Sequence, residues 1–385
     1  MLKKILFVIG TRPEAIKMAP VIWEMQRRRR AFNPIVCLSG QHRELLDQMV
    51  KALRLPVDFD LNVMKPQQSL EQLTASLLLV LKQVLSRVRP DMVLVQGDTS
   101  TVFVASLAAF YQSIPIAHVE AGLRTFDKFV PFPEEINRRL TSHLADLHFA
   151  PTATARHNLL AEGIPPHSIH VTGNTVIDAL LAILERSRLE SLVPAQFQQR
   201  LDLLTADGHR LILVTAHRRE SFGRPLERIC AAIRKIAEAW PGVNILYPVH
   251  MNPRVSQPVR DKLGRLGNVH LIRPLAYPSF VLAMKQSFLI LTDSGGVQEE
   301  AASLGKPVLV MRDKTERPEV VTAGVGRLVG TSSETIIREV STLLERPTAY
   351  RAMSRKCTAY GDGHAAKRIV RHIEEYLGSR KKRSR

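Results

Sequence analysis

Ionisable side chains in this sequence stand directly after short apolar segments, in a pattern that suits proton transfer and anion binding. Asp98 follows the segment Met92–Gln96, and Glu120 follows Pro115–Val119. A carboxylate held against a weakly acidic C–H bond can remove or return its proton. His217 lies between an apolar segment and two arginines, which favours a site for an anion. The pattern therefore predicts acid–base chemistry beside a negatively charged group.

Two further groups favour phosphate as that anion. Gly295 and Gly296 precede an expected helix, whose first N–H groups and dipole can hold a phosphate. Arg12 and Lys17 lie five residues apart on another opening helix. Because Arg12 stands at the junction of strand and helix, a diphosphate bound there could reach it.

Each of these residues also has a structural interpretation. The two glycines could form a tight turn, and Arg12 and Lys17 could be ordinary surface charges. Asp98 is a natural N-cap for a helix that begins at Thr99. His217 could be hydrogen-bonded inside a core. No single residue therefore decides the function.

A metal site is not expected. His118 and Glu120 share one face of a strand by their spacing, but no third ligand is near them in sequence. The chain has no HExxH motif, and Cys37, Cys230 and Cys357 form no CxxC pair. Cysteines so widely spaced also argue against a disulfide framework and suit the reducing cytoplasm.

The elements that position these residues alternate between strand and helix patterns, as in parallel α/β sheets. Ligands of such sheets bind beyond the carboxyl ends of the strands. The strands expected in the first half are Ile5–Ile9, Pro34–Leu38, Met92–Gln96, Pro115–Val119, Leu147–Ala150 and Ile169–Thr172. Those expected in the second half are Leu211–Thr215, Val243–Val249, Val269–Ile272, Leu289–Thr292, Pro307–Met311 and Arg327–Val329.

Two helix starts are explicit in the sequence. Thr11–Glu14 combines a capping box with a proline at the first helical position. Ser69–Gln72 is a second capping box. It opens an apolar stripe made of Leu73, Leu77, Val80 and Leu81.

The strand–helix rhythm lapses between residues 186 and 210, in a charged and glutamine-rich segment. We therefore expect two Rossmann-like, doubly wound α/β domains that face each other across a cleft, the N-terminal over 1–173 and the C-terminal over 174–364. A helix at about 365–378 could pack back on the first domain. Residues 379–385 form a basic tail.

Composition is that of an ordinary globular protein. Of the 385 residues, 45% are hydrophobic and 23% charged, which is enough apolar material for two cores. No segment approaches the ~20 apolar residues of a membrane span. The apolar run after Lys4 is too short for a signal peptide. We therefore expect a cytoplasmic protein with no membrane partner.

The net charge of +18 raises the question of nucleic acid. Part of the excess is local, in Arg27–Arg30 and in Arg380–Arg385, which we interpret as solvated segments. No RNA-binding signature is present, and with only 5% aromatic residues there are few platforms for base stacking. Specific nucleic-acid binding is not expected, whereas steering of anionic substrates is.

Ten motifs, in order from Gly10 to Gly363, resemble those of the non-hydrolysing UDP-N-acetylglucosamine 2-epimerases. They are GTRPEAIKMAP, QHRELLDQM, GDTST, HVEAGLRT, PFPEEINR, HRRESFG, LTDSGGVQEE, SLGKPVLVMRD, TERPE and YGDG. Departures from the family pattern are small. Ala302 stands where proline is expected and Val325 where threonine is common, and the three residues before Tyr360, which begin with Cys357, also differ. None of them removes an ionisable site residue.

The resemblance implies a fold similar to the GT-B glycosyltransferases and an isomerase that interconverts UDP-GlcNAc and UDP-ManNAc for polysaccharide biosynthesis. UDP would be eliminated across C1–C2 to give 2-acetamidoglucal and then added back to the opposite face of C2. Carried over by motif, the acid/base carboxylates are Asp98, Glu120 and Glu134, with His217 also catalytic. The substrate-binding residues, most of them in a UDP-binding C-terminal domain, are Arg12, Lys17, Phe280, Ser294, Gly295, Gly296, Glu300 and Arg317.

The resemblance also implies no cofactor, a homodimer, and a second UDP-GlcNAc bound at an allosteric site formed by Gln41, His42 and His250. The alternatives within enzymes are a hydrolysing epimerase, which would release ManNAc and UDP, and a GT-B glycosyltransferase. From another class, a catalytically silent nucleotide-binding or RNA-binding protein would share the fold and the charge. Conversion of UDP-GlcNAc distinguishes these alternatives.

Overall fold

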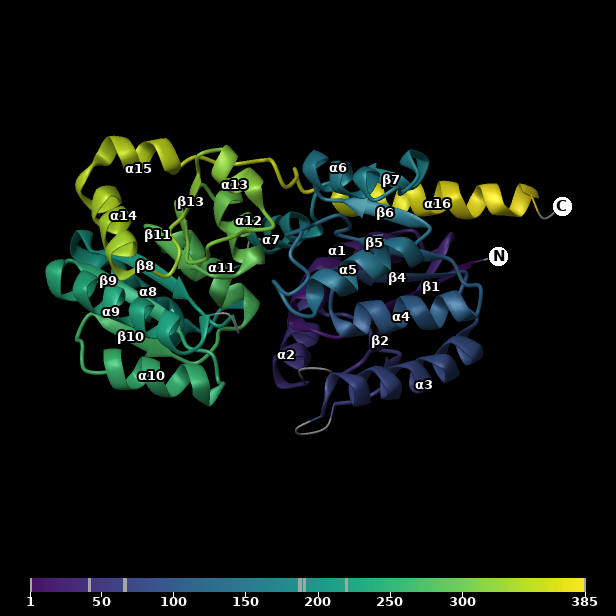
Figure 1. Ribbon diagram of the computed structural model, residues 1–385, viewed down its shortest axis with the longest axis horizontal. Coiled ribbons are helices and arrows are strands. Elements are labelled where there is room, and N and C mark those ends of the chain that lie inside the picture. Colours follow the sequence, from purple (N-terminus) through teal and green to yellow (C-terminus); the bar gives the residue numbers. More distant parts are fainter. Residues whose placement is uncertain are drawn as a thin grey trace. The chain divides into compact units, whose positions relative to one another are not determined.

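The computed structural model describes residues 2–40, 43–64, 68–185, 189, 192–218 and 221–383. The chain divides into two compact units, the first comprising Met1–Leu181 with Tyr360–Arg385 and the second Ala182–Ala359 (Figure 1). Each unit is an α/β structure built on a parallel sheet, which confirms the expected fold class. In the part of the chain that is described, no helix has the length and apolar character needed to cross a membrane.

The sheet of the first unit has seven strands in the order β3-β2-β1-β4-β5-β6-β7. Six of them lie within two residues of their predicted ends, whereas β3, with only two residues, is too short for the sequence pattern to reveal. The central strands are buried on both faces, as continuous apolar runs in parallel sheets are. The strands are β1 (Lys3–Ile9), β2 (Phe32–Leu38), β3 (Phe59–Asp60), β4 (Met92–Gln96), β5 (Ile116–Val119), β6 (Leu147–Ala150) and β7 (Ile169–Val171).

Helices cover this sheet in two layers, one containing α1, α2 and α16 and the other α3, α4 and α5. Right-handed crossovers on either side of β1 place such layers on opposite faces. The helices are α1 (Arg12–Arg27), α2 (Arg43–Leu53), α3 (Leu70–Val88), α4 (Ser100–Tyr111), α5 (Glu134–Leu144), α6 (Ala153–Ala161), the 3₁₀ turn η1 (Pro166–Ser168), α7 (Thr175–Glu185) and α16 (Ala365–Arg383).

The two predicted capping boxes have different outcomes. At α3 the box is present, because the Ser69 hydroxyl accepts from the Gln72 N–H at 3.3 Å and the Gln72 amide oxygen accepts from the Ser69 N–H at 3.1 Å. At α1 the prediction is wrong. The Thr11 hydroxyl donates to the Glu14 carboxylate instead of accepting from the backbone, and Glu14 reaches back to the N–H of Gly10.

The sheet of the second unit has six parallel strands in the order β10-β9-β8-β11-β12-β13. All six lie within one residue of their predicted ends. They are β8 (Arg210–Thr215), β9 (Val243–Pro248), β10 (Val269–Ile272), β11 (Leu289–Thr292), β12 (Val308–Val310) and β13 (Gly326–Leu328).

The amphipathic helix α9 of this unit has the buried stripe that a surface helix needs, with Leu226, Ile229, Ile233 and Ile236 facing the core. The helices and 3₁₀ turn are α8 (Ala195–Thr205), η3 (Ala206–Gly208), α9 (Arg224–Ala239), α10 (Pro253–Leu263), α11 (Tyr277–Gln286), α12 (Gly295–Ser303), α13 (Pro318–Thr322), α14 (Ser333–Glu345) and α15 (Pro347–Met353).

The boundaries of the units differ from the predicted boundaries at 173/174 and 364/365. The first two turns of α7 and the segment before α16 belong to the first unit. The reason is a pair of local contacts: the Asp178 carboxylate accepts from the first two N–H groups of α16, Ala365 at 3.2 Å and Ala366 at 2.8 Å. Burial of this carboxyl group raises its pKa to about 6.

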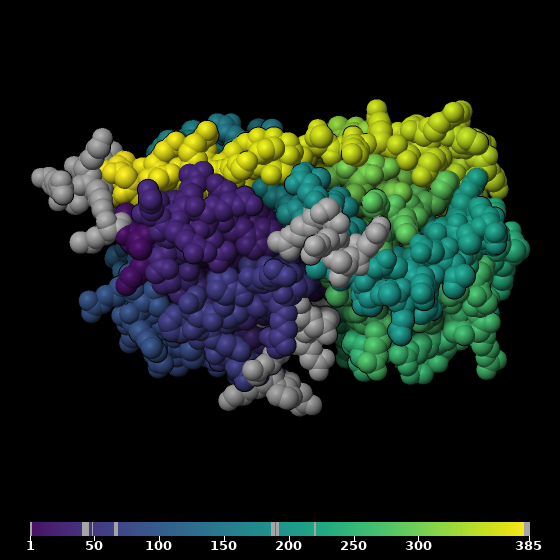
Figure 2. Space-filling view, turned by 180° about the vertical axis from the view of Figure 1, so that it is seen from behind, coloured from purple at the N-terminus to yellow at the C-terminus, as the bar shows by residue number. Residues whose placement is uncertain are grey.

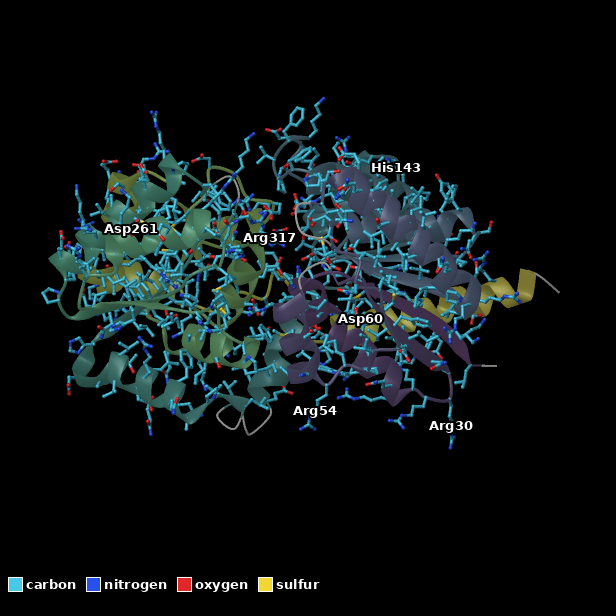
Figure 3. The ribbon with its side chains drawn as sticks, turned by 90° about the horizontal axis from the view of Figure 1, so that it is seen from below. Arg30, Arg54, Asp60, His143, Asp261 and Arg317 are labelled. Carbon is cyan, nitrogen blue, oxygen red and sulfur yellow. The ribbon has the colours of Figure 1, made fainter. Side chains whose placement is uncertain are left out.

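Helix α16 runs along the N-terminal part of the first unit, where it contacts α1 (Figure 2). Arg28, just beyond the end of α1, pairs with Glu374 of α16 at 3.1 Å. The neighbouring Arg27, Arg29 and Arg30 are exposed, as the sequence predicts, and Arg30 projects outward from the unit (Figure 3).

Strand order locates the candidate site within each unit. From β1 the chain first adds strands on one side and then, from β4 onward, on the other side of the first sheet. In the second sheet the same change lies between β8 and β11. Such switch points open a crevice at the carboxyl ends of the two strands, and ligands of doubly wound sheets bind there. The candidate residues are therefore those that follow β1, β4 and β5 in the first unit and those that follow β8 and β11 in the second.

Candidate active site

Glu120 lies one residue past the end of β5 and is almost completely buried. Its φ of 63° is in the left-handed region, which few residues other than glycine adopt. Because of this turn, the alternation of the strand does not extend to Glu120, and its predicted sharing of one face with His118 has no basis. His118 is engaged separately, with Nε2 2.7 Å from the carbonyl of Gly97.

Three nitrogen atoms surround the Glu120 carboxylate. Lys17 Nζ is 2.5 Å from Oε1, Gln96 Nε2 is 2.5 Å from Oε2, and Asn174 Nδ2 is 2.7 Å from Oε1. All three nitrogens donate, so the carboxyl oxygens must accept, and this arrangement favours the ionised form. The structure thus brings together the predicted Lys17 and Glu120.

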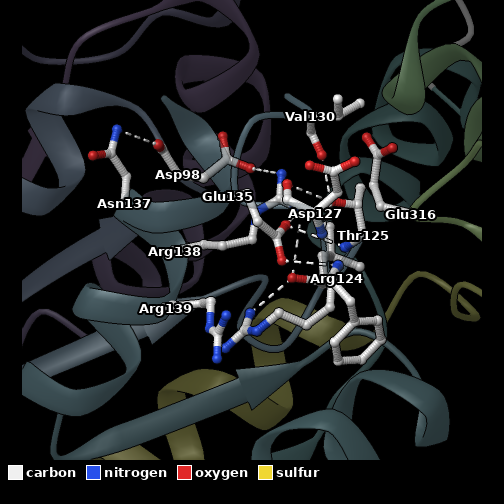
Figure 4. Close-up of polar contacts among 12 residues, drawn as sticks. Asp98, Arg124, Thr125, Asp127, Val130, Glu135, Asn137, Arg138, Arg139 and Glu316 are labelled. Carbon is white, nitrogen blue, oxygen red and sulfur yellow. Dashed lines mark hydrogen bonds and ion pairs between the residues drawn. The ribbon is translucent and has the colours of Figure 1, made fainter. Parts of the chain in front are cut away.

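Asp98 stands at the end of the β4 segment and is paired with Arg138 of α5, whose Nη2 is 2.5 Å from Oδ2. The Asn137 amide also donates to the Asp98 carbonyl at 3.0 Å (Figure 4). The N-cap of α4 is Thr99. The structural interpretation of Asp98 as an N-cap is therefore wrong, and its carboxylate is left to interact with the arginine.

Glu134 and Glu135 are adjacent but have different environments. Glu134 is the first residue of α5 and is half-buried. Glu135 is fully buried, accepts from the N–H groups of Thr125 and Phe126 at 3.1 Å, and pairs with Arg138 at 3.2 Å (Figure 4). Glu135 therefore fixes the preceding loop, which leaves Glu134 as the candidate for chemistry.

Arg12 and Glu14 occupy the first turn of α1, beside the switch point. Arg12 is half-buried at the first helical position. Glu14 accepts from the Gly10 N–H at 2.6 Å and from the hydroxyls of Thr11 and Thr99, both at 2.9 Å. Glu14 thus joins the segment after β1 to the segment after β4. Burial raises its pKa to about 7.

In the second unit, Asp293 organises the segment after β8. Its Oδ2 accepts from the N–H groups of His217 and Arg218, both at 2.8 Å, while Oδ1 lies 3.6 Å from His217 Nδ1. Asp293 is fully buried, whereas the His217 side chain is 41% exposed. The buried carboxylate thus lies behind an accessible imidazole ring, whose exposed edge can contact an anion.

The predicted allosteric residues are only partly within the described structure. His250, which follows β9, stacks on His217 with ring centroids 5.7 Å apart and an interplanar angle of 10°. Gln41 and His42 lie outside the described residues. The structure therefore places one member of this group against a proposed catalytic residue.

Arg317 is held tightly beside the start of α12. Its Nε is 2.5 Å from Glu299 and its Nη1 is 2.6 Å from Glu316, which also pairs with Arg312 at 2.7 Å. A Cβ atom at Gly295 would overlap the Arg317 guanidinium, so this position requires glycine. The geometry brings a positive side chain and a helix N-terminus together, as phosphate binding needs.

The remaining predicted binding residues also lie in this unit. Ser294 is the N-cap of α12, and its side chain makes no capping hydrogen bond, while Gly296 has open space where a Cβ would be. Glu300 is buried and accepts from the Tyr277 hydroxyl at 2.6 Å. Phe280 is almost completely buried on α11.

Several residues of the site were not predicted. Gln96 and Asn174 are neutral amides, and the sequence offers no sign that they contact Glu120 from opposite directions. Arg138 and Asp293 were inside recognised motifs, but only the fold shows what they bind. A useful signal was the position of Gln96 and Asp293 at strand ends, where parallel sheets place ligand-binding groups. Within the described ranges, no three His, Cys, Asp or Glu side chains are grouped to hold a metal ion.

Comparison with known proteins places this geometry in context. A family model described as UDP-N-acetylglucosamine 2-epimerase matches residues 24–374. The chain is 52% identical over 373 residues to the UDP-N-acetylglucosamine 2-epimerase of Salmonella typhimurium, which covers 97% of this chain and 99% of the relative.

Solved structures show the same similarity. UDP-GlcNAc 2-epimerase from Neisseria meningitidis, bound to UDP-GlcNAc, superposes with a TM-score of 0.92 and 48% identity, covering 97% of this chain and 100% of the other. The Methanocaldococcus jannaschii UDP-GlcNAc 2-epimerase, in complex with UDP-GlcNAc and UDP, has a TM-score of 0.85 and 35% identity, covering 96% and 99%.

Proposed function

The chain belongs to the UDP-N-acetylglucosamine 2-epimerase family, and from that premise we propose that it interconverts UDP-GlcNAc and UDP-ManNAc without hydrolysis. The proton on C2 is transferred to a carboxylate, the C–H electron pair forms the C1=C2 bond of 2-acetamidoglucal, and UDP departs from C1 with its bonding pair. UDP then returns to C1 while a proton is added to the opposite face of C2. The single observation that carries this proposal is the buried Glu120 carboxylate, held by three nitrogen donors.

The first unit would supply the acid and base groups. Epimerisation needs one group to remove the proton and another to return it on the other face. Asp98 and Glu120 follow the neighbouring strands β4 and β5, and Glu134 begins α5, so the three carboxylates have different environments. Asp98 is paired with Arg138, Glu120 accepts from amides and a lysine, and Glu134 begins a helix. We propose that these three groups share the roles of acid and base on the two faces of the sugar.

The second unit would hold the nucleotide and stabilise the departing diphosphate. Positive groups placed in advance lower the cost of the charge that develops as the C1–O bond breaks. Ser294, Gly295 and Gly296 offer the N–H groups of α12, with Arg317 beside them. His217, oriented by Asp293, would donate to the diphosphate. Glu300 would accept from the ribose hydroxyls, and Phe280 would contact the base.

Arg12 and Lys17 would add positive charge from α1 of the first unit. We infer further that the enzyme acts in the cytoplasm as a homodimer. A second UDP-GlcNAc would bind at Gln41, His42 and His250 and favour closure. The stacking of His250 on His217 supports this regulation, because a ligand at His250 would bear directly on the histidine proposed to contact the diphosphate.

The test is to incubate the purified protein with UDP-GlcNAc in D₂O and analyse the products by NMR and mass spectrometry. The expected product is UDP-ManNAc that carries one deuterium at C2. Release of ManNAc and UDP would show a hydrolysing enzyme instead. UDP-ManNAc without deuterium at C2 would contradict the elimination mechanism, and recovery of unchanged UDP-GlcNAc would contradict the epimerase activity.

A further inference from the structure

Two chain segments that belong to the first unit, one leading into the second unit and one returning from it, run side by side at Asn174. The Asn174 N–H donates to the Tyr360 carbonyl at 2.6 Å. Next to them, Gly173 and Gly361 have φ values of 85° and 134°. A Cβ at Gly173 would lie 3.1 Å from the Gly361 Cα, so the two backbones can approach this closely only with glycine. We call Gly173–Asn174 and Tyr360–Gly361 the double crossing.

The side chain of Asn174 is fixed at both of its polar atoms. Its Oδ1 accepts from the Val176 N–H at 3.2 Å, which caps the first turn of α7. Its Nδ2 donates to Glu120 Oε1 at 2.7 Å. Because the oxygen is committed to a backbone N–H, the NH₂ group must face the glutamate. Asn174 is 2% exposed, so water does not compete for these contacts.

The three donors on Glu120 come from different parts of the first unit. Lys17 belongs to α1, and Gln96 is the last residue of β4, in the centre of the sheet. Asn174 alone among these three belongs to the double crossing. Glu120 itself has a left-handed backbone, a conformation that persists only where its surroundings hold it. Its orientation therefore depends on contacts that include the crossing.

We propose that Asn174 is a positioning residue through which the double crossing sets the orientation of the catalytic Glu120. Any rotation of the backbone at Gly173 or Gly361 moves Asn174, because its N–H is bound to the returning segment. The amide then carries that movement to the Glu120 carboxylate. This inference rests on the proposed function, since it assumes that Glu120 acts on the sugar.

The substitution Asn174→Asp separates positioning from a structural role. Aspartate keeps the side-chain oxygen that caps α7, and it is as good a capping residue as asparagine. However, it replaces the amide donor with a second carboxyl group beside Glu120. Two carboxyl groups in contact share one proton and titrate as a pair. The shared proton keeps a donor on Glu120 at low pH, whereas at high pH both groups are ionised and repel each other.

We therefore expect kcat of Asn174→Asp to be at least tenfold below that of wild type at high pH and to recover as the pH is lowered. Neither wild type nor Asn174→Ala should show this pH dependence of kcat. Asn174→Ala should lower kcat about tenfold at every pH, with KM little changed. The matched control is Asn158→Ala. Asn158 is a half-buried amide of the first unit that donates to the Gly122 carbonyl at 2.9 Å and not to Glu120, so its loss should leave kcat unchanged.

A double-mutant cycle tests the link to the crossing itself. Gly173→Ala disturbs the crossing, and it should lower kcat in the wild-type background more than in the Asn174→Ala background. Equal effects in both backgrounds, or an Asn174→Asp enzyme with the wild-type pH profile, would overturn the inference. If wild type itself does not convert UDP-GlcNAc, the proposed function fails first, so the two failures are distinguishable.

Discussion

At the carboxyl edge of each sheet lies a buried ionic cluster, and one such cluster of the first unit centres on a carboxylate whereas one of the second centres on an arginine. Glu120 is the example in the first unit, with Gln96 and Asn174 as neutral donors. Arg317 is the example in the second unit, where it forms ion pairs with Glu299 and Glu316. Both edges lie at the switch point of a doubly wound sheet, so the fold alone does not explain the difference.

This difference agrees with the division proposed above, in which the first unit transfers protons and the second binds the nucleotide. A carboxylate can take up and release a proton, which suits proton transfer. An arginine keeps its charge under all ordinary conditions, and a fixed guanidinium beside a helix N-terminus suits the binding of phosphate. The proton chemistry proposed for the first unit and the anion binding proposed for the second would then follow from different side chains on a common scaffold.

The largest expected effect is on turnover, from removing a carboxylate of the first unit. Asp98→Asn, Glu120→Gln and Glu134→Gln keep the shape of the side chain but remove its basicity. Each should lower kcat by ~10²–10⁴-fold. UDP affinity, measured by calorimetry, should stay near that of wild type, because most of the nucleotide contacts are proposed for the second unit.

The neighbouring Glu135 provides the control for that experiment. Because Glu135 holds the backbone of Thr125 and Phe126, Glu135→Gln should lower the free energy of unfolding, which Glu134→Gln should leave unchanged. A Glu120→Gln enzyme with wild-type kcat, or with UDP affinity lowered as much as kcat, would break the division of labour between the units.

The second expected effect is a pH dependence of stability that arises in the first unit, at Glu14. Glu14 has a folded pKa of about 7 against 4.5 for the ordinary side chain, so its protonated form is favoured by folding. Its contribution to stability is therefore complete below pH 4.5 and is lost as the pH rises through 7. At ~1.4 kcal/mol for each pH unit of pKa change, the loss is about 3 kcal/mol.

Glu14→Gln isolates this contribution, because glutamine can accept from the Gly10 N–H and donate to the two threonine hydroxyls at all pH values. Between pH 4.5 and pH 8, wild type should lose about 3 kcal/mol of unfolding free energy relative to the variant. A difference is needed because the buried His118, with its pKa lowered to about 3, acts in the opposite direction. Hydrogen exchange should find the change in β1 and β4, and none in β8 and β11.

The smallest effect concerns the two glycines of the second unit. Gly295→Ala places a methyl group against an Arg317 side chain that two glutamates prevent from withdrawing, so it should lower the free energy of unfolding by about 1–3 kcal/mol. Gly296→Ala meets open space and should leave stability unchanged. Both should weaken UDP binding, since each adds a methyl group at the proposed phosphate site. Equal stabilities for the two variants, measured as Tm without ligand, would contradict the tight packing around Arg317.

Much of the fold was predictable because strands in parallel sheets are short, apolar and buried on both faces. Twelve of them follow from that pattern alone. The pattern missed β3, since two residues carry no periodicity. It also misplaced the boundary between the units, because the decisive contacts join Asp178 to Ala365 and Ala366, nearly two hundred residues away.

The candidate site was likewise predictable only in part. Charged residues at strand ends could be singled out from sequence, since their chemistry and position are both visible there. Asn174 could not, because an amide has no titratable group and its partner Glu120 is 54 residues distant. The capping box expected at Thr11 failed for a related reason: Glu14 finds a hydroxyl from Thr99 of another segment, which local spacing does not reveal.

The interruption of the first unit has a consequence for how the protein is made. Residues Ala182–Ala359 are synthesised before Tyr360–Arg385, and domains fold largely as they leave the ribosome. The second unit therefore has its whole sequence available while the first still lacks α16 and the Tyr360 carbonyl that binds Asn174. Assembly therefore does not follow the order of the chain. The second unit, with the proposed phosphate site, can be finished first, and the first unit is completed by a segment translated after it.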